Sequence, residues 1–574
     1  MNRSNSSTAT KCSVARREIN LLGKPRRWLR MALLLGTLPI SVLPTPVMAA
    51  ERIYGSYSVL ERSISVDALE TYAKEGKLDE DLAVYARYLK PEQLAQLRRV
   101  LLARANLSAV AISQFLYTPA GETLLQRLGQ VIQTESRQPG FYALRAALIL
   151  AAADPEGLTL LNVLRKFPTR SIRVDLSRSL KIAEQLKDLV NQTNQEIALI
   201  KQQSTAAATT PQTVDFSQLP DLRRRGRFSW NKQTLKLNDK TRDRVFLTDV
   251  YIPQQKAEKF SPQSPVIVIS HGLGSDRTSF EYLAQHLASY GFAVAVPEHP
   301  GSSAEQLRSL LAGRAKTVAE PNEFINRPLD IKYLLNQLAR LDASNSSFQL
   351  NLQQVGVIGQ SFGGYTALAL AGASLNFDQL QKDCEDLNES WNVSLLLQCR
   401  VLELPRTQYN LSDSRVKAAI AINPITSSIF GEASLSKIKV PVMIVSSSDD
   451  TVAPALSEQL QPFTWLTTPQ KYLAVIERGT HFSTIGETNP ATDPFILPAQ
   501  VIGPSPAIAR GYMNALSLAF LQTYIAKAPQ YRPYLSATYA QVISQQPLNL
   551  SLVQSLSVNQ LTQSIQRSYP VNKN

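Results

Sequence analysis

The spacing of apolar residues divides the chain into two regions with different predicted secondary structure. From about Val66 to Ile200 the apolar positions follow a helical period, as with Leu94, Leu97 and Leu101 at i, i+3 and i+7. This stretch contains no His and no Cys, which excludes a metal site built from those residues there. We therefore predict a small all-α domain over residues 50–201, with the apolar stripes of its helices as the core.

After this region both the composition and the period of the pattern change. Residues 202–224 are rich in Ser, Thr, Ala and Gln, which is the composition of a linker. The period then shortens towards two, so residues 228–237 and 244–252 are predicted to be two strands joined by a polar turn.

From there to about residue 535, short apolar strands alternate with amphipathic helices, a pattern typical of a mostly parallel sheet. Helices are predicted near 279–290, from about Pro328 to Leu341, after Ser361, and from about Ala507. The predicted strands cover residues 266–270, 292–296, 355–358, 416–422, 440–445 and 471–476. We assign residues 225–535 to one α/β domain and residues 536–574 to a C-terminal tail. Pro328 is expected at the first helical position.

Positive charge is concentrated near the N-terminus and does not indicate nucleic-acid binding. The formal net charge is +14 at pH 7, but residues 1–49 carry eight Lys or Arg and one Glu, which leaves +7 for the rest. The basic stretch ends at Arg30 and is followed by a short apolar segment and by Ala49 and Ala50, the pattern of a signal peptide. We therefore predict export to the periplasm or the extracellular space, with an uncleaved anchor as the alternative.

Two further sequence features, a basic cluster and a pair of cysteines, allow more than one interpretation. The basic cluster at residues 223–227 is compatible with a solvated linker or with peripheral contact with acidic lipid headgroups. Cys384 and Cys399 are 15 residues apart, and two cysteines in an oxidising compartment predict a disulfide, with two free thiols as the alternative. Cys12 falls within the signal peptide.

The segment Gly359-Gln360-Ser361-Phe362-Gly363 carries the strongest indication of chemistry. A Gly-x-Ser-x-Gly pattern alone is weak, but this one lies between a predicted strand and a predicted helix. A sharp strand–turn–helix of this kind holds a serine hydroxyl above the edge of a sheet, where it can act as a nucleophile. We therefore assign Ser361 as the candidate nucleophile.

A nucleophilic serine needs a base, and this architecture requires the chain order serine, acid, histidine. His481 is the single histidine of the four that follows Ser361, so it is the candidate base. Asp449 and Asp450 follow the predicted strand 440–445, and either could orient the imidazole ring. We choose Asp450 and keep Asp449 as the alternative.

Two backbone N–H groups are also required to stabilise an oxyanion. One is expected from Phe362, directly after the nucleophile, and the other from Leu273 in the loop Ser270-His271-Gly272-Leu273-Gly274 that follows an earlier predicted strand. His271 is then interpreted as a residue that organises this loop. His286 and His299 are given structural roles.

Three motifs together resemble the platelet-activating-factor acetylhydrolase and dienelactone-hydrolase-like branch of the α/β-hydrolases. They are residues 270–274 (SHGLG), 297–299 (PEH) and 359–364 (GQSFGG), and the similarity covers about residues 225–530. The helical front half resembles an uncharacterised domain found ahead of exported bacterial α/β-hydrolases. The resemblance implies the α/β-hydrolase fold and ester hydrolysis through an acyl-serine intermediate, without a metal or an organic cofactor.

The chain departs from this family at two places. In the animal acetylhydrolases the acid follows the strand next after the nucleophile strand, where this chain has Asn423-Pro424. The acid role is therefore moved to Asp450, whose position four residues before Pro454 matches a pattern common among α/β-hydrolases. A long apolar insertion at residues 375–412 resembles a cap over the site.

These observations predict a serine hydrolase that acts on a small-molecule or lipid ester, with short-chain or phospholipid acyl esters as the first expectation. Long-chain lipid or polyester cleavage is the alternative within the enzyme class, because residues 450–454 also resemble cutinase-type enzymes. A non-catalytic exported scaffold protein is the alternative from a different class.

Overall fold

The computed structural model describes residues 49–209, 214–254, 263–344, 348–385, 387, 390–487 and 499–556. These residues belong to one compact unit. The predicted signal peptide lies outside the described residues, apart from Ala49. Within the described part of the chain, no helix combines the length and the apolar character needed to cross a membrane.

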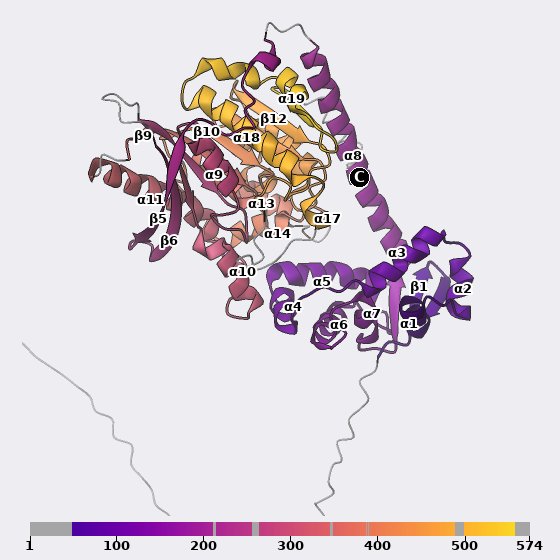
Figure 1. Cartoon of the computed structure of the whole chain (residues 1–574). Coiled ribbons are helices and arrows are strands. Elements are labelled where there is room, and N and C mark those ends of the chain that lie inside the picture. Colours follow the sequence, from indigo (N-terminus) through magenta and orange to yellow (C-terminus); the bar gives the residue numbers. More distant parts are fainter. Residues whose placement is uncertain are drawn as a thin grey trace, which may run out of the picture. The chain divides into compact units, whose positions relative to one another are not determined.

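A large sheet forms the centre of the region after residue 225 (Figure 1). Within the described residues it has nine strands in the order β13-β12-β11-β10-β9-β7-β8-β6-β5. The run from β12 to β8 is parallel, whereas β13, β6 and β5 pair antiparallel at the two ends. The strands are β5 (Ser229–Asp239), β6 (Arg244–Gln254), β7 (Ser264–Ser270), β8 (Ala293–Pro297), β9 (Leu350–Gln360), β10 (Val416–Ile422), β11 (Val442–Ser447), β12 (Lys471–Ile476) and β13 (Leu550–Val553).

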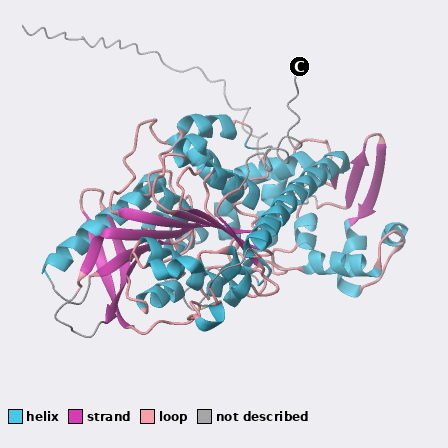
Figure 2. Ribbon diagram, turned by 90° about the horizontal axis from the view of Figure 1, so that it is seen from above, coloured by secondary structure: helices cyan, strands magenta, loops and turns pink. Residues whose placement is uncertain are grey.

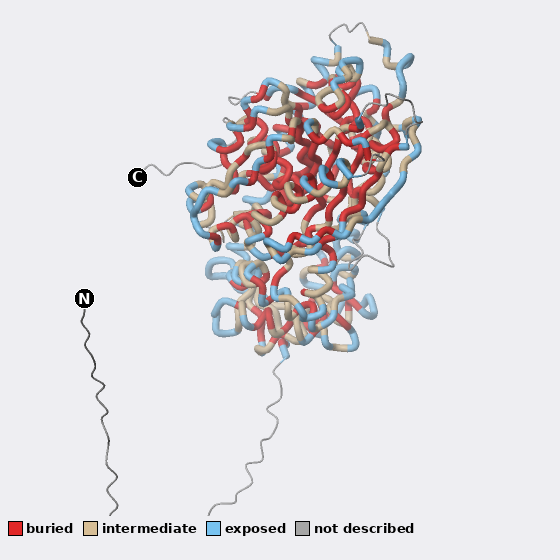
Figure 3. Tube along the Cα trace, turned by 90° about the vertical axis from the view of Figure 1, so that its left-hand side faces the viewer, coloured by how far each residue is buried: buried red, intermediate tan, exposed pale blue. Residues whose placement is uncertain are grey.

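Helices cover both faces of this sheet (Figure 2). Alternate residues of a strand point to opposite faces, so Ile267 and Ile269 of β7 pack against one helical layer and Val266 and Val268 against the other. The first layer includes α9 (Glu281–Ala288), α18 (Pro506–Tyr524) and α19 (Ala537–Ile543). The second includes α11 (Glu323–Ser344), α12 (Phe362–Leu370), α15 (Ser427–Leu435) and α16 (Gln461–Trp465). Burial on both faces explains the continuous apolar runs of the central strands (Figure 3).

The predicted α/β class with a mostly parallel sheet is confirmed, but α11 begins earlier than predicted. This helix begins at Glu323, so Pro328 lies inside it and not at its first position. A proline in a helix has no N–H to give to the carbonyl four residues earlier. Here the hydroxyl of Tyr365 donates to that carbonyl, Phe324 O, at 2.7 Å, which explains why the proline is accepted.

The predicted C-terminal tail is also wrong in its described part. Residues that follow position 536 form α19 and then β13, which adds an antiparallel strand to the edge of the large sheet beside β12. All four residues of β13 are buried. A short loop separates α19 from β13 and interrupts the apolar pattern. The sequence therefore shows no regular alternation that would predict this strand.

The region ahead of residue 202 is not all-α as predicted, because it also contains a small sheet of order β2-β1-β4-β3. No residue of β1 or β2 is fully buried, so these strands lack the apolar alternation that would reveal them. The elements are β1 (Arg52–Tyr57), β2 (Leu60–Ser65), α1 (Val66–Glu75), α2 (Glu80–Ala86), α3 (Pro91–Leu102), α4 (Ala109–Leu116), α5 (Pro119–Val131), β3 (Ile132–Gln133), α6 (Phe141–Ala153), α7 (Leu160–Arg165), β4 (Ser171–Asp175) and α8 (Leu176–Ala208).

The long helix α8 passes through the predicted start of the linker at residue 202. The Ala and Gln residues that suggested a linker are also good helix formers, so composition alone misplaced this boundary. The end of α8 packs beside the edge of the large sheet. Ser204 Oγ accepts from the N–H of Leu552 in β13 at 3.1 Å, and Lys201 pairs with Glu477 at 3.0 Å.

Further helices lie in the connections of the large domain and complete the description. They are α10 (Ala304–Leu311), α13 (Phe377–Cys384), α14 (Leu395–Gln398) and α17 (Ala499–Ile502). The helices α13 and α14 belong to the insertion at residues 375–412.

Candidate active site

Ser361 occupies a strained turn between β9 and α12. Its backbone angles are φ 56° and ψ −117°, in a region that residues with a side chain rarely adopt. The neighbouring glycines make this turn sterically feasible, because a Cβ on Gly359 would lie 1.9 Å from the carbonyl oxygen of Gly363. A Cβ on Gly364 would lie 2.7 Å from Pro424 Cβ, so the start of α12 packs directly against the loop after β10.

His481 and Asp450 are in direct contact although each follows a different strand. His481 Nδ1 lies 2.6 Å from Asp450 Oδ2. The other carboxylate oxygen, Oδ1, accepts from the N–H groups of Val452 at 2.8 Å and Ala453 at 2.7 Å. With Nδ1–H directed at a carboxylate, the second ring nitrogen, Nε2, is left as the acceptor.

Asp449, the alternative acid, has a different environment. Its side chain is exposed and accepts from Ser448 Oγ at 2.6 Å. Asp450 and His481 are 5% and 3% exposed. The aspartate that contacts the imidazole is therefore the buried one of the two. Of the two aspartates, the structure brings Asp450 to the imidazole.

The turn that carries Ser361 and the loop that carries His481 lie side by side. Gln360 Nε2 donates to the carbonyl oxygen of His481 at 3.1 Å, and Asn423 Nδ2 donates to the same oxygen at 3.3 Å. The N–H of Ser361 donates to Ile422 O at 2.8 Å. Ser361 as a residue is 7% exposed, and its hydroxyl makes no hydrogen bond among the described residues.

The loop after β7 lies against the same turn. A Cβ on Gly272 would lie 2.3 Å from Gln360 Oε1, and a Cβ on Gly363 would lie 2.0 Å from Ser270 O. Glycine at these two positions therefore permits a close approach that a larger residue would block. In the described part of the chain, the N–H groups of Leu273 and Phe362 donate to no protein acceptor.

Among the described residues, His271, His286 and His299 make no hydrogen bond with Ser361, and two of them belong to a polar cluster that the sequence analysis does not predict. His271 and His299 are fully buried behind the loop after β7, with Arg327 and Asp330 of α11. A usable signal was present in the sequence: Glu323, Arg327 and Asp330 recur at i, i+4 and i+7 and thus share one helix face. His286 lies in α9, and burial lowers its pKa to about 4.

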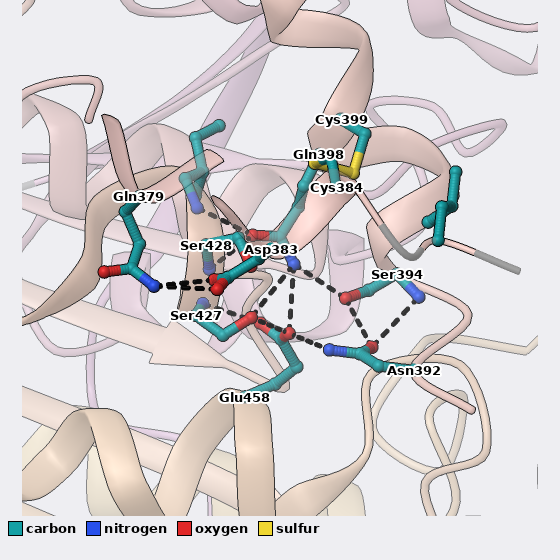
Figure 4. Close-up of a disulfide and its surroundings, with 12 residues drawn as sticks. Gln379, Asp383, Cys384, Asn392, Ser394, Gln398, Cys399, Ser427, Ser428 and Glu458 are labelled. Atoms are coloured by element: carbon teal, nitrogen blue, oxygen red, sulfur yellow. Dashed lines mark hydrogen bonds between the residues drawn. A yellow bond between two sulfur atoms is a disulfide. The ribbon is translucent and has the colours of Figure 1, made fainter. Parts of the chain in front are cut away.

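The insertion at residues 375–412 is held by a disulfide and by a buried carboxylate (Figure 4). Cys384 and Cys399 are joined, with their Cα atoms 5.8 Å apart. The structure thus has the predicted disulfide and not the alternative of two free thiols. Closing a loop of this size stabilises the fold by about 3 kcal/mol in the chain-entropy account of disulfides.

Glu458 is the buried carboxylate that connects this insertion to α15. Its Oε1 accepts from the side-chain amides of Asn392 and Gln398 and from the Ser427 hydroxyl, the Gln398 bond measuring 3.0 Å. Its Oε2 accepts from the N–H of Thr426 at 2.6 Å and of Ser427 at 3.0 Å. These two elements are thus linked through one side chain (Figure 4).

Comparison with known proteins agrees with this architecture. Residues 49–175 match the family model described as alpha/beta hydrolase of unknown function (DUF1400), and residues 230–327 match platelet-activating factor acetylhydrolase, isoform II. The chain carries the α/β-hydrolase fold. The second match contains the loop after β7 and ends within α11, before Ser361.

A curated relative is similar to part of this chain. Platelet-activating factor acetylhydrolase of the dog, Canis lupus familiaris, is 30% identical over 149 residues. The match covers 20% of this α/β-hydrolase and 33% of the relative, so it spans about a third of the relative's length. The resemblance to the platelet-activating-factor acetylhydrolase branch is confirmed by these matches.

Proposed function

We propose that this α/β-hydrolase is a serine esterase that cleaves carboxylic esters through an acyl-Ser361 intermediate. The observation that carries the proposal is the buried contact between His481 and Asp450. The loop that carries His481 is hydrogen-bonded to Gln360, next to Ser361 in its strained turn. A buried imidazole whose Nδ1 faces a carboxylate is held in the orientation that a general base requires, with Nε2 as the nitrogen that takes the proton.

In the proposed reaction, Ser361 Oγ attacks the carbonyl carbon of the ester while His481 Nε2 takes the hydroxyl proton. The negative charge on the former carbonyl oxygen is held by the N–H groups of Leu273 and Phe362. Collapse of this intermediate breaks the bond to the alcohol, which leaves with the proton from His481. Water activated by His481 then releases the acid and restores the serine.

Asp450 orients the imidazole and stabilises its charged form without taking the proton. Its second oxygen is occupied by two backbone N–H groups, which fixes the carboxylate plane relative to the ring. This arrangement supports Asp450 over Asp449 as the acid. No step of the reaction needs a metal or an organic cofactor.

Short-chain or phospholipid acyl esters are the proposed substrates. The support is the similarity to a family described as platelet-activating factor acetylhydrolase, which lies in the region of the loop after β7. The insertion at residues 375–412 is proposed to cover the site as a cap and to limit the length of the acyl chain. Export to the periplasm or outside the cell is proposed as well, and the disulfide fits an oxidising compartment.

Labelling with a fluorophosphonate probe tests the proposal directly. The purified protein should bind the probe covalently, and Ser361→Ala should abolish both labelling and hydrolysis of p-nitrophenyl acetate. A folded protein that neither labels nor hydrolyses esters would favour the non-catalytic scaffold. A series of p-nitrophenyl esters then separates the substrate classes, because a rate that rises with chain length would favour a long-chain lipase or polyester hydrolase.

A further inference from the structure

A buried cluster of charged and polar side chains lies directly beneath the loop that carries Leu273. We define this Arg327 cluster as His271, His299, Arg327, Asp330 and Ser302. Its helix, α11, contributes Arg327 and Asp330, both with no exposed surface. Neither of these residues has a part in the proposed proton transfers, so their burial needs another explanation.

Arg327 contacts both segments that carry the proposed oxyanion donors. Its Nη1 donates to the carbonyl oxygen of His271 at 2.7 Å, and its Nη2 donates to the carbonyl oxygen of Gly272 at 3.3 Å. Its Nε donates to Ser302 Oγ at 2.8 Å. The guanidinium carbon also lies 4.3 Å from the ring centre of Phe362, on the side of the serine turn.

The carbonyl of Gly272 and the N–H of Leu273 belong to the same peptide group. A trans peptide is planar, so its C=O and its N–H point in opposite directions. Hydrogen bonds that fix the Gly272 oxygen therefore fix the direction of the Leu273 N–H. Two donors act on this oxygen: Arg327 Nη2 at 3.3 Å and His271 Nδ1 at 2.7 Å.

The donor role of His271 follows from its other ring nitrogen. The backbone N–H of His299 donates to His271 Nε2 at 3.0 Å, so Nε2 carries no proton and Nδ1 does. His299 Nε2 and Nδ1 contact Ser270 Oγ and Asp330 Oδ2, each at 3.0 Å. Burial, followed by the charge of Arg327, lowers the pKa of both histidines well below the usual value, which keeps the rings neutral.

The positive charge of Arg327 is balanced within the same region. Burial lowers its pKa to about 9, against the opposing effect of Glu323 and Asp330, so the guanidinium stays protonated at neutral pH. The Ser302 hydroxyl, which accepts from Arg327 Nε, donates in turn to Glu323 Oε2 at 2.8 Å. Glu323 and Asp330 are also both paired with Arg244 at 2.8 Å. A rigid, charge-balanced support of this kind loses no energy in reorganising when charge develops nearby.

We infer that Arg327 and His271 are positioning residues that hold the Leu273 N–H toward the oxyanion of the reacting ester. This inference rests on the proposed esterase function. It assigns to the Arg327 cluster the task of fixing one peptide group, and neither side chain needs to touch the substrate. Their loss should weaken binding of the transition state and leave binding of the uncharged ester unchanged.

Four variants of the full-length protein test the inference. Arg327→Lys keeps the charge but cannot reach two carbonyls in a fixed fork. His271→Ala removes the Nδ1 donor, whereas His271→Asn restores an N–H at nearly the same place. Arg340→Lys, at an exposed position of α11, is the matched control.

We expect Arg327→Lys and His271→Ala to lower kcat for p-nitrophenyl acetate by about 10- to 100-fold, with KM within about two-fold. Affinity for a trifluoromethyl ketone, which forms a charged tetrahedral adduct with the serine, should fall by a similar factor. His271→Asn should recover most of the lost kcat, and Arg340→Lys should match the wild type.

The outcomes separate this inference from the proposed function. If the wild type hydrolyses the ester and Ser361→Ala does not, but Arg327→Lys and His271→Ala keep wild-type kcat, the positioning role is wrong and the esterase stands. Equal losses in His271→Asn and His271→Ala, with a lowered Tm and a changed KM, would indicate a merely structural role. A wild type without activity or labelling removes the esterase itself.

Discussion

At the scale of single residues, Asn423 shows how an amide at a strand end can hold a neighbouring loop. It follows β10, the strand next to that of Ser361. Its Oδ1 accepts from the N–H of Ser447 at 2.9 Å, and its Nδ2 donates to Ser447 Oγ at 3.1 Å and to His481 O at 3.3 Å. Asn423 therefore fastens the loop of the proposed base, and the proposed acid, Asp450, follows the neighbouring strand β11.

The two neighbouring aspartates give a matched pair of variants for the proposed acid. Asp450→Asn should lower kcat by about 10⁴-fold, because the amide no longer stabilises the charged imidazole and favours the wrong tautomer. Asp449→Asn should stay within about three-fold of the wild type, since that side chain is exposed and does not contact His481. Steady-state ester hydrolysis measures both. A larger loss in Asp449→Asn would reverse the assignment.

The environment of Asn423 predicts that the acid cannot simply be moved back. In Asn423→Asp the side chain would turn a carboxylate oxygen toward the carbonyl of His481 in place of an N–H. We expect a loss of about 1–3 kcal/mol in the free energy of unfolding in urea. The double variant Asn423→Asp, Asp450→Asn should stay as inactive as Asp450→Asn. Recovered activity in the double variant would show that the two strand ends are equivalent.

The Ser361 turn and the Arg327 cluster differ in how much of them the sequence reveals. The sequence predicts the Ser361 turn because its glycines and the order of strand, turn and helix are local features. The candidate base followed by elimination, since no other histidine comes after Ser361. The Arg327 cluster depends on contacts between α11 and the loop after β7, which are more than 50 residues apart. The spacing of its residues along α11 marks a polar helix face, but it does not show which loop that face contacts.

At the scale of elements, the strength of the burial pattern decided what could be predicted. The strand at 471–476 matches β12 residue for residue because its apolar run is continuous. The strands β1, β2 and β13 are not predicted, since short or half-exposed strands carry little alternation. The predicted helical region ends before α8 does, because the last turns of α8 have a linker-like composition.

The insertion at residues 375–412 depends on Glu458, whose carboxylate receives donors and no cation in the described structure. In Glu458→Gln an amide NH₂ would face N–H or NH₂ groups at one of the two oxygen positions. We expect a loss of about 1–3 kcal/mol in the free energy of unfolding. Glu432→Gln, at an exposed position of α15, is the control and should change stability by less than about 0.5 kcal/mol.

Limited proteolysis adds a readout specific to the insertion. Cleavage within residues 375–412 should be faster in Glu458→Gln than in Glu432→Gln, because the side chains of Asn392 and Gln398 lose their acceptor. Equal stability and equal cleavage in the two variants would mean that Glu458 does not hold the insertion.

At the scale of the whole molecule, the segment predicted as a tail completes the large sheet. The strand β13 pairs with β12, and α19 packs in the same core as α9 and α18. A truncation after Ser536 removes both elements and leaves the edge of β12 unpaired. Unpaired apolar edges promote aggregation.

We expect the truncated protein to accumulate as insoluble aggregate, whereas a truncation after Leu556 should remain soluble and keep the wild-type Tm within about 2 °C. The second variant retains α19 and β13 and is therefore the matched control. Size-exclusion chromatography and thermal unfolding distinguish the two. A soluble, active protein ending at Ser536 would show that β13 is dispensable.

The contact between Ser204 and Leu552 has a consequence for the order of folding. It joins a helix ahead of the large domain to the strand that is made last among the described ones. During synthesis β12 and the loop of His481 emerge before β13, so the sheet stays open at that edge for the time needed to make about 75 more residues, at roughly 5–20 residues per second. During that interval the exposed edge of β12 is the part of the new sheet that other chains could pair with.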